Sequence, residues 1–172
     1  MAFPVTLNHL YAAGVTAERA KIFLMPLNAA MSEFQIDRFE RPAMFLAQIV
    51  EESGAFRWMA EIWGPTPAQS RYPGGFEWRG HGMIQITGEA NHRAEAEFFG
   101  IPMSGIADWL MTPVGACRSA AHFWSAHGCN ALSDAFDFVG VTRKINGNVA
   151  VPNGLALRAS LYQKIAEAMN GR

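Results

Sequence analysis

Apolar residues recur at helical spacing in five stretches of the chain, and few segments show the alternating, β-branched pattern of a strand. The five stretches are 17–34, 43–50, 91–99, 113–127 and 155–169. An apolar face that repeats every three to four residues is stable when it packs against other helices. The sequence therefore predicts a mainly α-helical fold, and its 172 residues suit a single domain over residues 1–172.

A long irregular loop is predicted between the second and third of these stretches. Segment 64–82 interrupts any regular element with three prolines and five glycines: Pro65, Pro67, Pro73, Gly64, Gly74, Gly75, Gly80 and Gly82. Aromatic residues occur in and beside it, namely Trp63, Tyr72, Phe76 and Trp78. A purely solvated linker is poor in such residues. We interpret the aromatic side chains as the floor of a carbohydrate groove, with partial burial beneath the loop as the alternative.

Two adjacent carboxylates end a stretch that is otherwise nearly apolar. At about 100° per residue, Glu52 lies below Phe45 and Ile49, whereas Glu51 projects to another side of the helix. Burial against apolar neighbours raises the pKa of a carboxyl group, which a general acid near neutral pH requires. Either glutamate could meet this condition, and a solvated helix end is the alternative for both.

Nine residues after Glu52, Glu61 stands at the edge of the irregular loop. Glycoside hydrolysis with inversion uses two carboxyl groups about 6.5–9.5 Å apart, one protonating the leaving oxygen and one activating water. A helix end followed by a turn can bring Glu61 opposite Glu52. Two unrelated surface glutamates would show the same spacing.

Run 83–87 has the alternation of a short strand. If Ile84 and Ile86 face the core, then Gln85 and Thr87 face the region that the loop covers. Their amide and hydroxyl groups could orient a sugar or a water molecule, although a surface strand would show the same pattern. Farther along, Asn146 lies in a turn signal, where an asparagine often only stabilises the turn.

Charge and composition exclude several classes of function. Fourteen basic and fifteen acidic residues without a basic block argue against nucleic-acid binding. No apolar run approaches the roughly 20 residues of a membrane span. Cys117 and Cys129 are expected to be reduced, and neither they nor the histidines have metal-ligand spacing. The first residues lack a secretory signal, so we expect a cytoplasmic product, and we expect a monomer.

Four separated segments carry a family resemblance: 23–31, 45–54, 80–91 and 142–147. In these segments the chain resembles glycoside hydrolase family 19, which is chitinase-like, and within it the small phage and prophage endolysins that cut peptidoglycan. The resemblance implies a lysozyme-like helical fold with a groove, inversion at the anomeric carbon and no cofactor. It implies Glu52 as general acid, Glu61 as general base and Thr87 as a hydroxyl that holds the attacking water. It also implies groove-lining or orienting roles for four residues: Gln85, Asn91, Asn146 and Arg158.

The chain departs from this family pattern at three places. Glu51 stands where the family usually has histidine, and His81 stands between two glycines where it usually has arginine. The loop from Glu61 to Thr87 is shorter than in chitinases, which predicts an open groove with few sugar subsites. We expect an endolysin that hydrolyses the β-1,4 bond between N-acetylmuramic acid and N-acetylglucosamine, with Tyr72 and Trp78 among its substrate contacts. Chitin hydrolysis and non-catalytic glycan binding are the alternatives.

Overall fold

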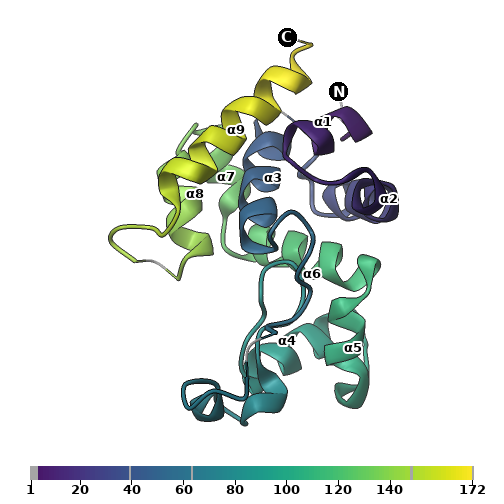
Figure 1. The fold of residues 1–172 in the computed structure, drawn as a ribbon, viewed down its shortest axis with the longest axis vertical. Coiled ribbons are helices and arrows are strands. Elements are labelled where there is room, and N and C mark those ends of the chain that lie inside the picture. The colour runs from purple at the N-terminus through teal and green to yellow at the C-terminus, as the bar shows by residue number, and fades with distance from the viewer. Residues whose placement is uncertain (1–3, 39, 63, 148, 172) are drawn as a thin grey trace.

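The computed structural model describes residues 4–38, 40–62, 64–147 and 149–171, so Trp63 lies outside the described residues. The fold is mainly helical, as predicted (Figure 1). Its α-helices are α1 (Leu7–Ala12), α2 (Ala17–Glu33), α3 (Arg41–Glu52), α4 (Glu89–Phe99), α5 (Ile106–Met111), α6 (Pro113–Ala126), α7 (Cys129–Asp134), α8 (Phe138–Ile145) and α9 (Leu155–Met169). Short 3₁₀ helices are η1 (Gln69–Arg71), η2 (Phe76–Trp78) and η3 (Met103–Gly105).

Helix α3 is buried along most of its length. Every residue from Arg41 to Val50 is buried, because α9 packs on this helix and α7 and α8 also contact it. Phe45 meets the ring of Trp124 of α6 edge-on, with 5.3 Å between ring centroids. Helix α2 in turn packs against α6. A helix held on so many sides is a rigid support, and Glu52 is its last residue.

The segment between α3 and α4 forms the predicted irregular loop. In Figure 1 it leaves the end of α3 and runs away from α9 toward α4 and α5. Backbone hydrogen bonds fold it on itself: the amide of Glu61 donates to the carbonyl of Gly80 at 2.8 Å, and the amide of Gly82 donates to the carbonyl of Met59 at 2.8 Å. The loop thus brings residues near 60 next to residues near 81.

The predicted strand at 83–87 is wrong. The chain makes a tight turn there, with Gln85 in the left-handed region at φ 56°, and the amide of Ile86 donates back to the carbonyl of His81 at 2.8 Å. A single isolated bridge joins those two residues in place of a strand pair. The predicted alternation of burial is nevertheless confirmed, because Ile84 and Ile86 are buried while Gln85 and Thr87 are partly exposed.

Other sequence expectations concern cysteines, metals and membranes. Cys117 and Cys129 are both free and buried, as predicted. Among the described residues, no three His, Cys, Asp or Glu side chains are grouped so that they could hold a metal ion. Within the same residues, no helix combines the length and the apolar character that crossing a bilayer requires.

Candidate active site

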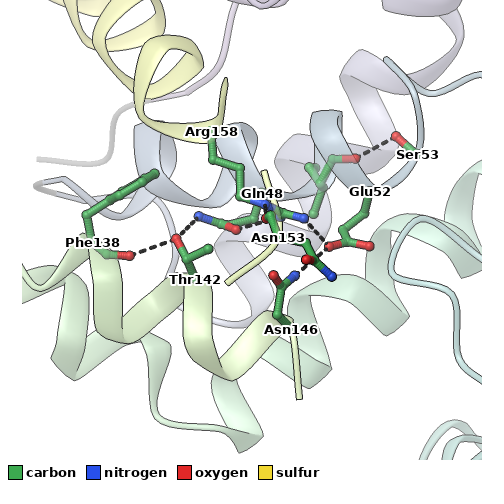
Figure 2. Close-up of polar contacts among 9 residues, drawn as sticks. Gln48, Glu52, Ser53, Phe138, Thr142, Asn146, Asn153 and Arg158 are labelled. Carbon is green, nitrogen blue, oxygen red and sulfur yellow. Dashed lines mark hydrogen bonds and ion pairs between the residues drawn. The ribbon is translucent and has the colours of Figure 1, made fainter. Parts of the chain in front are cut away.

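Glu52 is held at the end of α3 by two donors from distant parts of the chain. Arg158 of α9 donates from Nη2 to Oε1 of Glu52 at 2.5 Å, and Asn146, which follows α8, donates from Nδ2 to the same oxygen at 3.3 Å. Figure 2 shows the three side chains converging from α3, α9 and the end of α8. The contacts of Glu52 therefore depend on tertiary packing and not on its own helix.

Arg158 is itself fixed by a buried polar chain (Figure 2). Its Nη1 donates to Oε1 of Gln48 at 2.8 Å, and its Nε donates to the carbonyl of Asn153 at 3.1 Å. Gln48 extends this hydrogen-bond network, because its Nε2 donates to the hydroxyl of Thr142 at 3.0 Å. Arg158 and Gln48 are both buried. A buried guanidinium with this many partners has a fixed position, and so does the carboxylate that it binds.

Glu61 has a separate set of donors in the irregular loop. The Tyr72 hydroxyl donates to Oε1 at 3.2 Å, and the Gly80 amide donates to Oε2 at 3.3 Å. Burial and the neighbouring Glu61 carboxylate raise the pKa of Tyr72, so the phenol keeps its proton at neutral pH. Each oxygen of Glu61 thus accepts one hydrogen bond from the protein and has a further lone pair for another donor.

Glu52 and Glu61 line one open cavity of about 240 Å³. Its other lining residues are Trp58, Ala60, Ile62 and Gln85. The structure therefore brings together three of the residues singled out in the sequence, namely the two glutamates and Gln85. Glu51 does not line this cavity, because its carboxylate faces Gly154 at the start of α9, where an added Cβ would lie 3.0 Å from Oε1.

Thr87 and Asn91 are linked to Gln85 by successive hydrogen bonds. The Thr87 hydroxyl donates to the Gln85 carbonyl at 2.9 Å, and Nδ2 of Asn91 donates to the Thr87 carbonyl at 2.8 Å. Gln85 is held in turn by its Nε2, which donates to the carbonyl of Gly82 at 2.9 Å. Neither Thr87 nor Asn91 lines the cavity itself. Because the proton of the Thr87 hydroxyl is already donated, its oxygen can only accept a hydrogen bond from a ligand.

Several known proteins resemble this chain. No protein-family model matches it. An endochitinase of Arabidopsis thaliana is 32% identical over 136 residues, which make up 74% of this chain and 47% of that protein. A protein of Haemophilus influenzae named as containing a glycosyl hydrolase family 19 domain is 33% identical over 93 residues, 53% of this chain and 42% of its own length. Among solved structures, chitinase C from Streptomyces griseus HUT6037 has a TM-score of 0.72 at 19% identity, covering 98% of this chain and 77% of that one.

These relatives indicate glycoside hydrolase family 19. The names of the homologues support a glycoside hydrolase, and the structural likeness shows that the chain has the helical fold of chitinase C. The chain spans less than half the length of the curated relatives that it matches. Neither homologue is named a phage endolysin.

The aromatic residues near the candidate site differ in their relation to the cavity. Trp78 packs its ring on His92, with centroids 5.1 Å apart, and does not line the cavity of Glu52 and Glu61. Tyr72 contacts Glu61 directly. Trp58, which the sequence analysis did not single out, lines the cavity and is 37% exposed. Its position between the two glutamates was the signal that could have found it.

Gln48 is the other residue that sequence reasoning missed. It is fully buried in α3 and bonds both Arg158 and Thr142. A polar residue inside the apolar run 45–50, four residues before Glu52, lies on the same helix face as that glutamate. This spacing could have indicated that Gln48 supports the site.

Proposed function

We propose that this family 19 chain hydrolyses β-1,4 glycosidic bonds of peptidoglycan, between N-acetylmuramic acid and N-acetylglucosamine, with inversion at the anomeric carbon. One observation carries the proposal: Glu52 and Glu61 line a single cavity, and each carboxylate is held by its own donors. Inverting glycosidases need two carboxyl groups with different tasks. Because the two carboxylates have separate hydrogen-bond donors, one can act as the acid and the other as the base.

Glu52 is the proposed general acid. Both Arg158 and Asn146 bind its Oε1, and the side chains of the described residues offer no hydrogen bond to Oε2. A proton carried on Oε2 can pass to the glycosidic oxygen as the bond to the leaving sugar breaks. The negative charge that remains on Glu52 is then stabilised at Oε1 by the Arg158 guanidinium. Arg158 is a positioning residue in this scheme.

Glu61 is the proposed general base. Its carboxylate accepts one proton of a water molecule while the water oxygen attacks the anomeric carbon from the face opposite the leaving group. Tyr72 and the Gly80 amide orient the carboxylate without occupying all its lone pairs. Thr87 is proposed to accept the second water proton in a hydrogen bond, which turns the water oxygen toward the sugar.

Two features of the chain bear on the class of glycan that it cleaves. The motifs of the chain resemble those of small endolysins, and the shortened loop between Glu61 and Thr87 argues for an open groove with few subsites. Chitin is the second candidate, because the Arabidopsis thaliana relative is named an endochitinase. Both polymers contain β-1,4-linked N-acetylated sugars, so one active site could accept either.

Digestion of both polymers tests the proposal. Purified peptidoglycan and chitin hexamer are incubated with the wild type and with the Glu52→Gln/Glu61→Gln double variant, and mass spectrometry identifies the new chain ends. New reducing ends on N-acetylmuramic acid are expected with the wild type alone. Reducing ends on N-acetylglucosamine would indicate a glucosaminidase, anhydro ends a lytic transglycosylase, and cleavage of chitin alone a chitinase. Saturable binding to either polymer without new ends would indicate a glycan-binding module.

A further inference from the structure

Two buried histidines form a direct hydrogen bond behind the candidate site. His81 and His92 are 1% and 0% exposed, and Nδ1 of His81 lies 2.9 Å from Nε2 of His92. Their rings meet edge-on at 85°. Neither ring lines the cavity that contains Glu61. The pair is therefore shielded from solvent and is not placed to touch a substrate there.

The partners of the pair determine where its protons lie. Nδ1 of His92 is 2.9 Å from the carbonyl of Gly88, an acceptor, so Nδ1 of His92 must carry a proton. In a neutral His92, Nε2 is then an acceptor, and Nδ1 of His81 must donate to it. In the neutral pair, each ring therefore carries its proton on Nδ1.

The backbone connects this pair to Glu61. His81 stands between Gly80, whose amide donates to Oε2 of Glu61, and Gly82. The amide of His81 donates to the carbonyl of Ile86 at 3.0 Å, and Ile86 donates back at 2.8 Å. The His81 ring thus belongs to the residue directly after Gly80, within the same hydrogen-bonded turn. His92 attaches that ring to α4.

We propose that His81 and His92 act as a positioning pair that holds the Gly80 amide against the Glu61 carboxylate. The inference rests on the proposed function, in which Glu61 is the general base, and it names two residues that the base depends on. The pair holds the turn from Gly80 to Ile86 against α4. The Glu61 carboxylate, which the Gly80 amide binds, then meets the attacking water in one orientation.

The charges around the pair keep it neutral. Burial, the neighbouring His92 and the Arg79 guanidinium lower the pKa of His81 to about 4, against the opposing effects of Asp108 and the Arg79 carbonyl. Burial lowers the pKa of His92 as well, against the Gly88 carbonyl. A proton on Nε2 of His92 would remove the acceptor that Nδ1 of His81 uses, so the pair should hold at neutral pH and break in acid.

Nuclear magnetic resonance tests the pair without any substrate. Long-range ¹H–¹⁵N spectra of the wild type at pH 7 should show both His81 and His92 as Nδ1–H tautomers, and His81 should not titrate from pH 7 to pH 5. The Gly80 amide shift should follow the titration of Glu61, and this dependence should be absent in Glu61→Gln. An Nε2–H tautomer at His92, titration of His81 near 6.5, or a Gly80 amide indifferent to Glu61 would overturn the proposal. These measurements need no substrate, so they test the histidine pair even if the protein cleaves no glycan.

Two variants of His81 separate positioning from simple packing. Asparagine carries its Nδ2 near the position of the histidine Nδ1 and can still donate to His92, whereas leucine fills the space without a donor. We expect His81→Leu to lower kcat about 10- to 100-fold on peptidoglycan with KM changed less than about twofold, and His81→Asn to restore most of the loss. Equal activity of the two variants, or a loss in KM alone, would contradict a positioning role. If His81→Leu does not fold, the titration of the Gly80 amide in the wild type and His81→Asn decides the question.

Discussion

Arg158 binds Oε1 of Glu52 at 2.5 Å and thereby joins α9 to the carboxyl end of α3 across 106 residues of sequence. The guanidinium side chain is 5% exposed and the carboxylate side chain 22% exposed, so the ion pair lies at the boundary between the core and the cavity. The same contact therefore affects both the stability of the fold and the candidate acid.

Replacing Arg158 by methionine should destabilise the protein strongly. The change leaves Glu52 and the buried amide of Gln48 without their common donor, and loss of one partner of a buried ion pair costs about 3–5 kcal/mol. Since Glu52 is partly exposed, we expect about 2–4 kcal/mol in urea unfolding. Arg118→Met is the matched control, because Arg118 pairs with Glu33 at the surface, where such pairs contribute about 1 kcal/mol or less. Equal destabilisation by the two changes would contradict the importance of the buried pair.

Glu52→Gln should abolish glycan cleavage and leave the fold intact. The amide keeps the shape of the side chain but cannot deliver a proton to the leaving oxygen, and general acid catalysis contributes about 10²–10⁴ in rate. Glu51→Gln is the control, since Glu51 faces Gly154 and not the cavity. Release of reducing ends measures activity, and circular dichroism measures folding. An inactive Glu51→Gln beside an active Glu52→Gln would reverse the assignment.

Glu61→Gln should also lose about 10²–10⁴ in kcat, because an amide cannot take a proton from water. Tyr72→Phe removes one of the two donors to this carboxylate and should retain part of the activity. Added azide should not yield a glycosyl azide of retained configuration with Glu61→Gln. A covalent sugar trapped on Glu61 in the wild type would show that the carboxylate, and not water, is the nucleophile.

Long periodic segments of the fold were predictable from the sequence, and short ones were not. Residues 155–169 coincide with α9, and the predicted helix at 17–34 overruns α2 by one residue, because Phe34 is its cap. Helices α5 and α7 have six residues each, which is too short for a helical period to be recognised. At 83–87 a turn, and not a strand, produces the alternation of burial. The left-handed backbone of Gln85 that makes this turn cannot be recognised from a pattern of apolar residues.

The candidate site was predictable in its residue types but not in its contacts. Glu52 and Glu61 stood out because acidic residues flank an apolar helix and a glycine-rich loop. The choice between Glu51 and Glu52 depends on which one meets Arg158, and that contact is set by how α9 packs on α3. Likewise, nothing local indicates that His81 meets His92, because the turn between them decides it.

Stability should rise with pH between about 4 and 6.5. The pKa of His81 is lowered by burial to about 4 in the folded protein, against 6.5 for an ordinary histidine. In that window the unfolded chain binds a proton that the folded protein does not, so the free energy of unfolding increases with pH and levels off above it. His81 alone contributes up to about 3 kcal/mol to this change. Urea unfolding at pH 4.5, 5.5, 6.5 and 7.5 should show a smaller slope for His81→Asn than for the wild type, and an identical slope would contradict the prediction.

The anomeric configuration of the first product tests the two-carboxylate mechanism most directly. The wild type is mixed with a soluble β-1,4-linked peptidoglycan fragment, and the anomeric protons of the new reducing ends are followed by ¹H nuclear magnetic resonance before mutarotation equilibrates them. If Glu61 activates water opposite the bond that Glu52 protonates, the α-anomer appears first and the β-anomer grows in later. Initial formation of the β-anomer would mean net retention and would contradict the proposed roles of Glu52 and Glu61.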